Sequence, residues 1–368
     1  MAKAQATNTE KNIETGSSLR RGWTTGACAT AATKAALTAL LTGEFPDPVS
    51  ILLPKGDRPL FPLAREELGS DFAVAGIVKD AGDDPDVTHG ALIVSKVRRG
   101  VEGAGICFRA GSGVGIVTKA GLPVPVGEAA INPVPRTLMQ HEVEALCQTH
   151  DIPTDIEIEI SIPEGEQIAQ QTWNPRLGIV GGLSILGTTG VVHPFSCSAW
   201  IHSIHRGIDV ARAAGLNHVI AATGSTSEST AQAIYKLPEF GLLDMGDFAG
   251  GVLKYLRNHP VPKITLAGGF AKFTKLAQGA LDLHSGRSQV DFAFLAKQLD
   301  GSQSDLTNEI INANTAMEAL QLADAAGVDL AKPIAHHAKV TAEQALRGAP
   351  VDVEVIIVSR AGEIIARV

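Results

Sequence analysis

From Asn174 to the C-terminus, short apolar segments that end in glycine alternate with segments that favour helix. The apolar segments are LGIVGG (177–182), HVIAATG (218–224) and KITLAGG (263–269), and helices are expected near 196–214 and 229–237 and after 269. Fully apolar strands separated by helices are typical of parallel strands that are buried on both faces of a sheet. This pattern predicts an open, mostly parallel α/β sheet, which ends in a hairpin turned at Ala361-Gly362.

The first half of the chain has a different pattern, which predicts an α+β domain. A helix is expected over 26–42, because threonines that can cap it precede an alanine-rich run and Gly43 follows it. Short β-branched segments predict strands at VSILLP (49–54), FAVAGIVKD (72–80), ALIVSKVRR (91–99) and GICFRAG (105–111). The prolines of EAAINPVPR (128–136) argue against regular structure there, before a helix over 137–150 and a strand over 155–162.

Length and composition indicate the number of domains and the class of protein. The 368 residues suffice for two domains, and we expect a disordered tail over 1–18, an α+β domain over 19–172 and an α/β domain over 173–368. The net charge of −8 and the aromatic content of 4% argue against a nucleic-acid or membrane-surface partner. Four cysteines without a CxxC pair, and no apolar run of membrane length, indicate a reduced, cytoplasmic protein. A homo-oligomer is one option, and the sequence does not fix the oligomeric state.

Glycines mark three expected strand ends in the second half, at the edge where open α/β sheets bind their ligands. The residues at these ends are Gly181, Gly182, Thr223, Gly224, Ser225, Glu228, Gly268 and Gly269. Asp244 and Asp247 lie between the last two ends, where a carboxylate can accept hydrogen bonds from ribose hydroxyls. The pyrophosphate fingerprint G-x-G-x-x-G and the phosphate loop are both absent, so S-adenosylmethionine fits better than NAD or ATP. Such glycines serve as often only to make turns, and such aspartates are more often solvated caps.

The segment KDAGDDPDVTHG (79–90), named the acid loop below, holds four aspartates and a histidine between two expected strands. A calcium loop needs alternate oxygen ligands and a late glutamate, whereas these aspartates do not keep that spacing and Pro85 interrupts them. A solvated turn stays open, because Asp, Gly and Pro are turn residues. An acid/base centre stays open too, because close carboxylates raise one another's pKa.

Taken in order, seven stretches resemble the cobalt-precorrin-5B (C-1)-methyltransferase family of anaerobic-type cobalamin biosynthesis. They are RRGWTTGACATAATKAA, the acid loop, FRAGSGVGIVTKAGLPVPVGEAAINPVPR, NPRLGIVGGLSILGTTGVV, DMGDFAGG, KFTKLAQG and HSGRSQVDFAFLA, and they run from Arg20 to about Ala296. The acid loop and INPVPR are the specific motifs. The sequence departs from the family pattern at Asp244, where a glutamate is expected, and at HPFSCSAWIHSIHRG (193–207).

The resemblance implies transfer of a methyl group from S-adenosylmethionine to ring carbon one of cobalt-precorrin-5B, which gives cobalt-precorrin-6A. Cobalt then enters only as part of the corrinoid substrate, and the second domain is expected to be Rossmann-like. Asp83, Asp84 and His89 are expected to face the macrocycle, with one of them as the base that takes a proton after methylation.

The carboxylate arms of such a substrate need local donors, because the protein as a whole is acidic. The helix start near residue 26 is expected to offer free N–H groups to an anion. The full set of expected substrate-binding residues is Thr24, Thr25, Gly26, Arg109, Lys119, Asn132, Arg136, Arg176, Lys272, Lys275 and Arg287.

His193, Cys197, His202 and His205 lie within thirteen residues and raise the alternative of a metal site. We expect no metal there, because Cys197 lies off the face that the last two histidines share and no carboxylate orients a ring. A surface helix with a buried cysteine is the preferred interpretation. Two rival functions stay open: a corrinoid carrier without catalysis, and another α/β transferase that acts on an anionic small molecule. The missing phosphate loop and the missing G-x-S-x-G motif disfavour the second rival.

Overall fold

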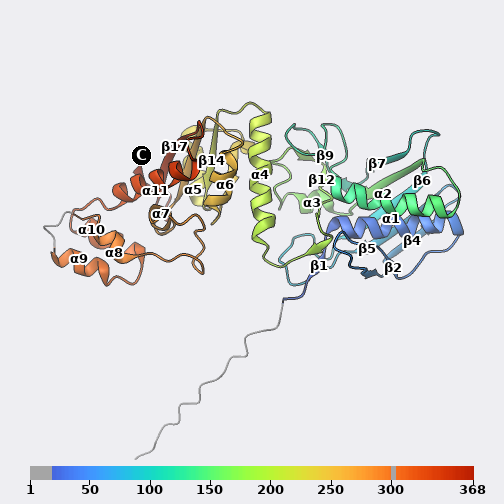
Figure 1. The fold of residues 1–368 in the computed structure, drawn as a ribbon, viewed down its shortest axis with the longest axis horizontal. Coiled ribbons are helices and arrows are strands. Elements are labelled where there is room, and N and C mark those ends of the chain that lie inside the picture. The colour runs from blue at the N-terminus through green and yellow to red at the C-terminus, as the bar shows by residue number, and fades with distance from the viewer. Residues whose placement is uncertain (1–18, 300–303) are drawn as a thin grey trace, which may run out of the picture.

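The computed structural model describes residues 19–299 and 304–368, and the tail expected over 1–18 lies outside them. The chain forms two lobes along one long axis, with helix α4 (Cys197–Ala213) upright between them (Figure 1). Each lobe has its own five-stranded sheet and its own apolar core. The two lobes therefore bury separate sets of side chains and meet around α4.

The sheet of the first lobe is mixed. Its strands, in spatial order, are β4 (Arg65–Leu68), β5 (Phe72–Val78), β6 (Leu92–Arg99), β10 (Ile156–Ser161) and β7 (Ile106–Ala110). Neighbours are antiparallel except β10 and β7, which are parallel. Helices α1 (Thr25–Thr42) and α2 (Pro133–Thr149) cover one face, and their buried side chains share a core with this sheet. The α+β prediction for this half agrees with that arrangement.

Helix α1 is built for close packing. The Thr24 side chain accepts a hydrogen bond from the Ala27 amide, and Gly43 ends the helix at a φ of 86°, so the expected caps are confirmed. Its alanines are buried around most of the helix surface, which lets α2 and the sheet approach closely. Helix α2 begins at Pro133, so the expectation that two prolines exclude regular structure was wrong. A proline in the first turn loses no helical hydrogen bond, because those N–H groups have no partner in any helix.

The sheet of the second lobe is mostly parallel, as predicted. Its order is β15 (Leu242–Asp244), β14 (His218–Ala222), β16 (Lys263–Gly269), β17 (Asp352–Val358) and β18 (Ile364–Arg367), and only β18 is antiparallel to its neighbour. Helix α5 (Ser225–Tyr235) covers one face, whereas α4, α6 (Ala249–Leu256), α7 (Phe270–Ala277) and α11 (Ala331–Leu346) pack on the other. Successive strands lie on opposite sides of β14, so the carboxyl ends of β14 and β16 flank the topological switch point.

Three short helices extend this lobe beyond α7, namely α8 (Phe292–Ala296), α9 (Ser304–Ile311) and α10 (Ala316–Ala325). The sequence pattern predicted none of them. The remaining elements are β1 (Gly22–Trp23), β2 (Val49–Ser50), β3 (Leu60–Phe61), β8 (Gly113–Val114), β9 (Ile116–Val117), α3 (Gly165–Ala169), β11 (Ile179–Val180), β12 (Gly182–Leu183), β13 (Val191–Val192) and the 3-10 turn η1 (Glu239–Gly241).

The segment between α3 and α4 lies in the first lobe. Strand β11 pairs with β9, β12 pairs with β8 and β13 pairs with β1. Ile185 is fully buried in the core of the first lobe. The LGIVGG segment is therefore not a strand of the second sheet, and the boundary expected near residue 172 moves to the start of α4. The pattern failed here because short apolar bridges look like buried strands in a single sequence.

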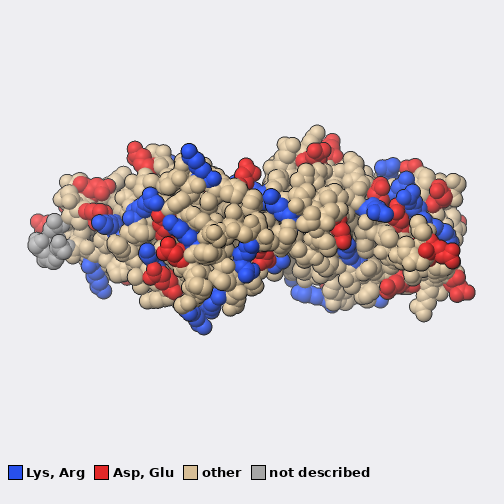
Figure 2. Space-filling view, turned by 90° about the horizontal axis from the view of Figure 1, so that it is seen from above, with Lys and Arg blue, Asp and Glu red and all other residues tan. Residues whose placement is uncertain are grey.

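Charged side chains of both signs are interspersed along both lobes on the face that Figure 2 shows. No helix within the described part of the chain is both long and apolar enough to cross a membrane. Because the charges of both signs are interspersed, a carboxylate of a ligand on this face would meet single cations with acidic neighbours.

Candidate functional site

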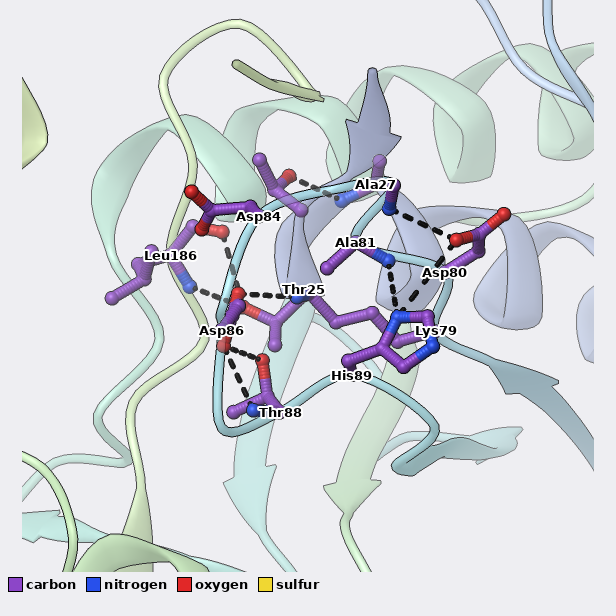
Figure 3. A network of polar contacts seen from close by, with 12 residues as sticks. Thr25, Ala27, Lys79, Asp80, Ala81, Asp84, Asp86, Thr88, His89 and Leu186 are labelled. Carbon is purple, nitrogen blue, oxygen red and sulfur yellow. Dashed lines mark hydrogen bonds and ion pairs between the residues drawn. The ribbon is translucent and has the colours of Figure 1, made fainter. Parts of the chain in front are cut away.

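The acid loop joins β5 to β6 and is fixed from beneath by Lys79. The Lys79 side chain is 1% exposed, and its Nζ lies 2.5 Å from Asp86 Oδ2. Asp86 Oδ1 accepts hydrogen bonds from the amide and hydroxyl of Thr88 (Figure 3). Burial alone would raise the pKa of Asp86, but the charge and hydrogen bond of Lys79 outweigh burial and hold this pKa below its usual value. Asp86 is thus an ionised structural partner of a buried ammonium.

Asp80 and His89 lie at the outer end of the same loop. Asp80 pairs with the Arg20 guanidinium and accepts from the Gly82 amide, and the bond to Arg20 lowers the pKa of this carboxyl. His89 Nδ1 accepts a hydrogen bond of 3.1 Å from the Ala81 amide. A neutral His89 ring therefore carries its proton on Nε2. In this geometry His89 is suited to donate a hydrogen bond from Nε2, because the lone pair on Nδ1 already accepts from the Ala81 amide.

The two aspartates predicted to be catalytic each accept a hydrogen bond from a backbone amide. Asp83 Oδ2 accepts from the Arg20 amide at 2.6 Å, and Asp84 Oδ1 accepts from the Phe195 amide at 2.7 Å. Asp83 is exposed, whereas Asp84 is half-buried. Figure 3 shows Asp84 and His89 on opposite sides of the loop. The three predicted side chains do not converge, and each has a different structural neighbour.

Three amides at the helix start, those of Thr24, Gly26 and Ala27, already donate hydrogen bonds within the protein. The Gly26 amide donates to Leu186 O at 2.9 Å, and the Ala27 amide donates to Thr24 Oγ1 at 3.2 Å. Thr25 Oγ1 exchanges hydrogen bonds with the backbone of Leu186 (Figure 3). The segment that follows β12 occupies most of this helix start, so the geometry does not favour the expected anion site.

A second cluster lies at the carboxyl ends of β14, β15 and β16, and we name this group of residues the carboxyl edge: Thr223, Gly224, Ser225, Glu228, Asp244, Asp247, Gly269 and Lys272. Gly224 is exposed and precedes α5, which begins at Ser225 without a side-chain cap. A side chain at Gly224 or Gly269 would meet no atom within 4 Å, so space is open above both strand ends. The backbone at these ends is accessible to a ligand, as the sequence predicted.

Asp244 ends β15 and is half-buried. Burial and the nearby charge of Glu228 raise the pKa of Asp244, whereas Arg176 and Lys272 act in the opposite direction. Four side chains that the sequence selected separately therefore influence one another through space. Arg176 belongs to the first lobe and reaches across to this place. Both of its terminal nitrogens pair with Glu228 of α5, at 2.9 and 2.8 Å. The carboxyl edge is thus completed by one arginine from the other lobe.

Lys272 connects the strand ends to each other. Its Nζ donates to Thr223 O at 3.1 Å and lies 3.0 Å from Asp247 Oδ1. Asp247 Oδ1 is buried, and this ammonium is its partner in the described residues. The open glycines and the acids Asp244 and Glu228 are compatible with an adenosyl group at this edge.

The first turns of α4 join the acid loop to the carboxyl edge. Phe195 is held by Asp84, Cys197 Sγ lies 3.4 Å from a terminal nitrogen of Arg287, and Trp200 Nε1 donates to Asp244 O at 2.9 Å. Arg287 also pairs with Asp282. Sequence reasoning missed Phe195 and Trp200, although two aromatic residues in one short segment are conspicuous in a chain with 4% aromatics.

Two predicted glycines lie away from this cluster. Gly181 and Gly182 belong to the first lobe, where Gly182 packs against the backbone of Gly113. Their expected role in cofactor binding is therefore corrected. The error arose because the LGIVGG segment was assigned to the second sheet. Gly268 is buried, and a side chain there would clash with Phe273 and Thr223, so it permits close packing rather than ligand access.

Several predicted substrate contacts are engaged inside the protein. Arg136 donates to two backbone carbonyls and pairs with Glu128, Lys275 is buried and donates to Leu283 O, and Lys119 lies over the Phe240 ring at 4.3 Å. Arg109 pairs with Glu157 on the sheet of the first lobe, and Asn132 is the first residue before α2. Arg136, Lys275, Lys119 and Arg109 are thus held by groups of the protein itself.

Cys197, His202 and His205 lie in α4, which packs on α6, whereas His193 precedes this helix. His205 stacks on Tyr255 with ring centroids 3.9 Å apart and contacts Gly251 O, and burial lowers the pKa of its imidazole. Within residues 19–299 and 304–368, no three His, Cys, Asp or Glu side chains gather so that they could hold a metal ion. Cys197 is half-exposed, so the expectation of a buried cysteine on a surface helix was wrong.

Two sequence models of known families match this chain. The model described as CbiD matches residues 12–194, and the model described as CbiD, C-terminal domain, matches residues 282–368. The chain belongs to the CbiD family. The first match ends at residue 194, and α4 begins at Cys197. The end of this match therefore agrees with the end of the first lobe.

Curated relatives match the CbiD chain over almost its full length. A protein of Brucella canis is 66% identical over 366 residues, which cover 99% of each chain. A protein of Brucella anthropi is 68% identical over 352 residues, which cover 95% of this chain and 96% of that one. Both carry the name cobalt-precorrin-5B C(1)-methyltransferase. A crystal structure of the cobalamin biosynthesis protein cbiD from Archaeoglobus fulgidus aligns with 84% of this chain and 85% of its own, at 24% identity and a TM-score of 0.39.

Proposed function

We propose that this CbiD protein transfers a methyl group from S-adenosylmethionine to ring carbon one of cobalt-precorrin-5B, which yields cobalt-precorrin-6A. The observation that carries the proposal is the 66% identity, over 99% of both chains, to a relative named cobalt-precorrin-5B C(1)-methyltransferase. The carboxyl edge supports it independently, because its open glycines and acids suit an adenosyl donor without a pyrophosphate.

The carboxyl edge is the proposed site for the methyl donor. Asp244 lies at the end of β15, beside β14, where its carboxylate accepts hydrogen bonds from the ribose hydroxyls. Gly224 and Gly269 let the backbone approach the ligand, and the uncapped start of α5 at Ser225 presents amides to the carboxylate of the methionine part. Lys272 and Arg176 balance the acids around it.

The donor supplies an electrophilic methyl carbon on a sulfonium. The electron pair of the ring carbon forms the new C–C bond while the S–CH3 bond breaks, and the sulfur leaves as a neutral thioether. The positive charge left on the corrinoid is removed when a proton leaves the ring system. The protein contributes alignment of the two reactants and exclusion of water, because methyl transfer needs no further chemical group.

Asp83 is our proposed acceptor for that proton. It is exposed, and its Oδ1 has no partner within the described residues, whereas Oδ2 holds the Arg20 amide. Asp84 instead positions Phe195, and His89 accepts from the Ala81 amide through Nδ1, which leaves its Nε2 available as a donor. Among the predicted cations, Arg287 is proposed to pair with a carboxylate arm, because it lies beside the start of α4.

An anaerobic incubation with cobalt-precorrin-5B and isotopically labelled S-adenosylmethionine tests the proposal, with mass spectrometry as the readout. We expect one labelled methyl group per corrinoid, at ring carbon one. Corrinoid binding without label transfer, alongside an active control methyltransferase, contradicts catalysis and supports a carrier. A carrier also shows no affinity for the donor, so a titration with S-adenosylmethionine separates the two. A cytoplasmic location and a homo-oligomeric state stay predictions.

A further inference from the structure

Phe195 has an unusual backbone conformation. It lies between β13 and α4 with a φ of 55°, in the left-handed region that bulky side chains avoid. Asp84 holds this conformation through its hydrogen bond to the Phe195 amide. A strained residue persists only where its surroundings determine it, and such residues cluster at ligand sites. One carboxylate of the acid loop, that of Asp84, thus fixes the position of Phe195.

The conformation puts the Phe195 ring into solvent, where it is 66% exposed. Exposure of a phenylalanine ring is unfavourable, because its apolar surface is better removed from water. Trp200, five residues further along, is 45% exposed, yet it packs beside Gly246 and Phe248 and donates to Asp244 O. Phe195 therefore offers a free apolar face on the acid-loop side, and Trp200 borders the carboxyl edge.

A cation lies beside this aromatic surface. The Arg287 side chain is 47% exposed and contacts Cys197, two residues after Phe195. Its contacts with Asp282 and Cys197 use two of the three guanidinium nitrogens, so donors remain for a further carboxylate. A flat apolar ring that carries carboxylate arms complements both features, the ring on Phe195 and an arm on Arg287.

We propose that Phe195 is the side chain on which the flat face of the tetrapyrrole substrate packs, with Arg287 as the partner of one carboxylate arm. The inference rests on the proposed function for the identity of the ligand. It adds a binding residue between the acid loop and the carboxyl edge, which is where a ring carbon must lie to meet the donor methyl group. Asp84 is then a positioning residue, which acts through Phe195.

Corrinoid binding to the full-length protein tests this directly, by anaerobic titration with cobalt-precorrin-5B followed through its visible absorption. In Phe195→Gly the ring is lost while glycine accepts the left-handed backbone, and in Phe195→Tyr the ring is kept. We expect the corrinoid Kd to rise at least about tenfold in Phe195→Gly and to change less than about threefold in Phe195→Tyr. Val101→Gly is the matched control, because Val101 is 79% exposed in the loop between β6 and β7.

The donor affinity and the melting temperature separate a binding role from a structural one. Phe195→Gly should leave the Kd for S-adenosylmethionine and the melting temperature unchanged, whereas a structural role moves all three quantities together. Unchanged corrinoid binding in Phe195→Gly overturns the inference. Corrinoid binding by the wild type without methyl transfer overturns the proposed function alone. A wild type that does not bind the corrinoid overturns both.

Discussion

At the scale of single residues, the proposed donor site predicts that Asp244 controls how the donor affinity depends on pH. Its pKa is raised by burial and by Glu228, and a bound ribose that donates to the carboxylate favours the ionised form. Donor affinity should therefore fall as the pH is lowered through this raised pKa, because the carboxyl group must lose its proton to accept both hydroxyls. Asp244→Asn should weaken donor binding by about 10- to 100-fold and flatten the pH profile. Calorimetric titrations from pH 4.5 to 8 check this, and an unchanged profile in the variant excludes Asp244 from the donor site.

Asp84 separates a positioning role from a proton-acceptor role. Asparagine keeps an oxygen that can accept from the Phe195 amide, whereas alanine does not. We expect Asp84→Asn to retain turnover within about fivefold and Asp84→Ala to raise the corrinoid KM about tenfold or more. A base would give the opposite pattern, with turnover lost in both variants and KM unchanged. Steady-state kinetics at saturating donor distinguish the two, and Asp83→Asn is the comparison that should lose turnover.

The sequence predicted single residues well where their position follows from a strand end. Asp244, Thr223 and Gly269 lie at the edge of one sheet because parallel strands bring their carboxyl ends together. The partners of Asp84 and Gly26 could not be predicted in this way. Phe195 and Leu186 are more than one hundred residues distant in the sequence, and no local pattern encodes a contact across such a separation.

At the scale of elements, the acid loop depends on its buried ion pair. Asp86→Ala leaves the Lys79 ammonium, 1% exposed, without a charged partner, and we expect a loss of about 3–5 kcal/mol in the free energy of unfolding. Adding Lys79→Met to Asp86→Ala should restore most of that loss, because the uncompensated charge is removed. Urea denaturation of the two variants and the wild type measures both effects. Equal stability of the single variant and the wild type contradicts the structural role assigned to Asp86.

The same pair gives a pH dependence with a definite sign. The pKa of Asp86 is lower in the folded protein than in the unfolded chain, so its contribution is present above the unfolded pKa and is lost as the pH falls through the folded one. The double variant lacks this contribution and should lose less stability on acidification.

Element boundaries were predicted well where caps mark them, as in α1, and poorly where prolines begin a helix, as in α2.

At the scale of the whole molecule, the sequence predicted two lobes with different sheets but misplaced their junction. The alternation of strands and helices is a local signal, and it survives in the order of β14, β15 and β16. The pairing of β11, β12 and β13 with strands early in the chain is a long-range property, so residues near 172 gave no sign of it. Arg176 and Glu228 show the consequence: both fall in the expected second domain, yet their ion pair joins the two lobes.

Two lobes that each hold one reactant should give separate footprints in hydrogen exchange. S-adenosylmethionine alone should slow amide exchange at 223–228 and 244–247, whereas the corrinoid alone should slow it in the acid loop and at 193–197. The reason is that bound ligands suppress the local openings through which amides exchange. Because Arg176 ties the carboxyl edge to the first lobe, the donor should also protect the backbone around residue 176, and Arg176→Ala should remove that effect only. Donor protection confined to the acid loop contradicts the assignment of the methyl donor to the second lobe.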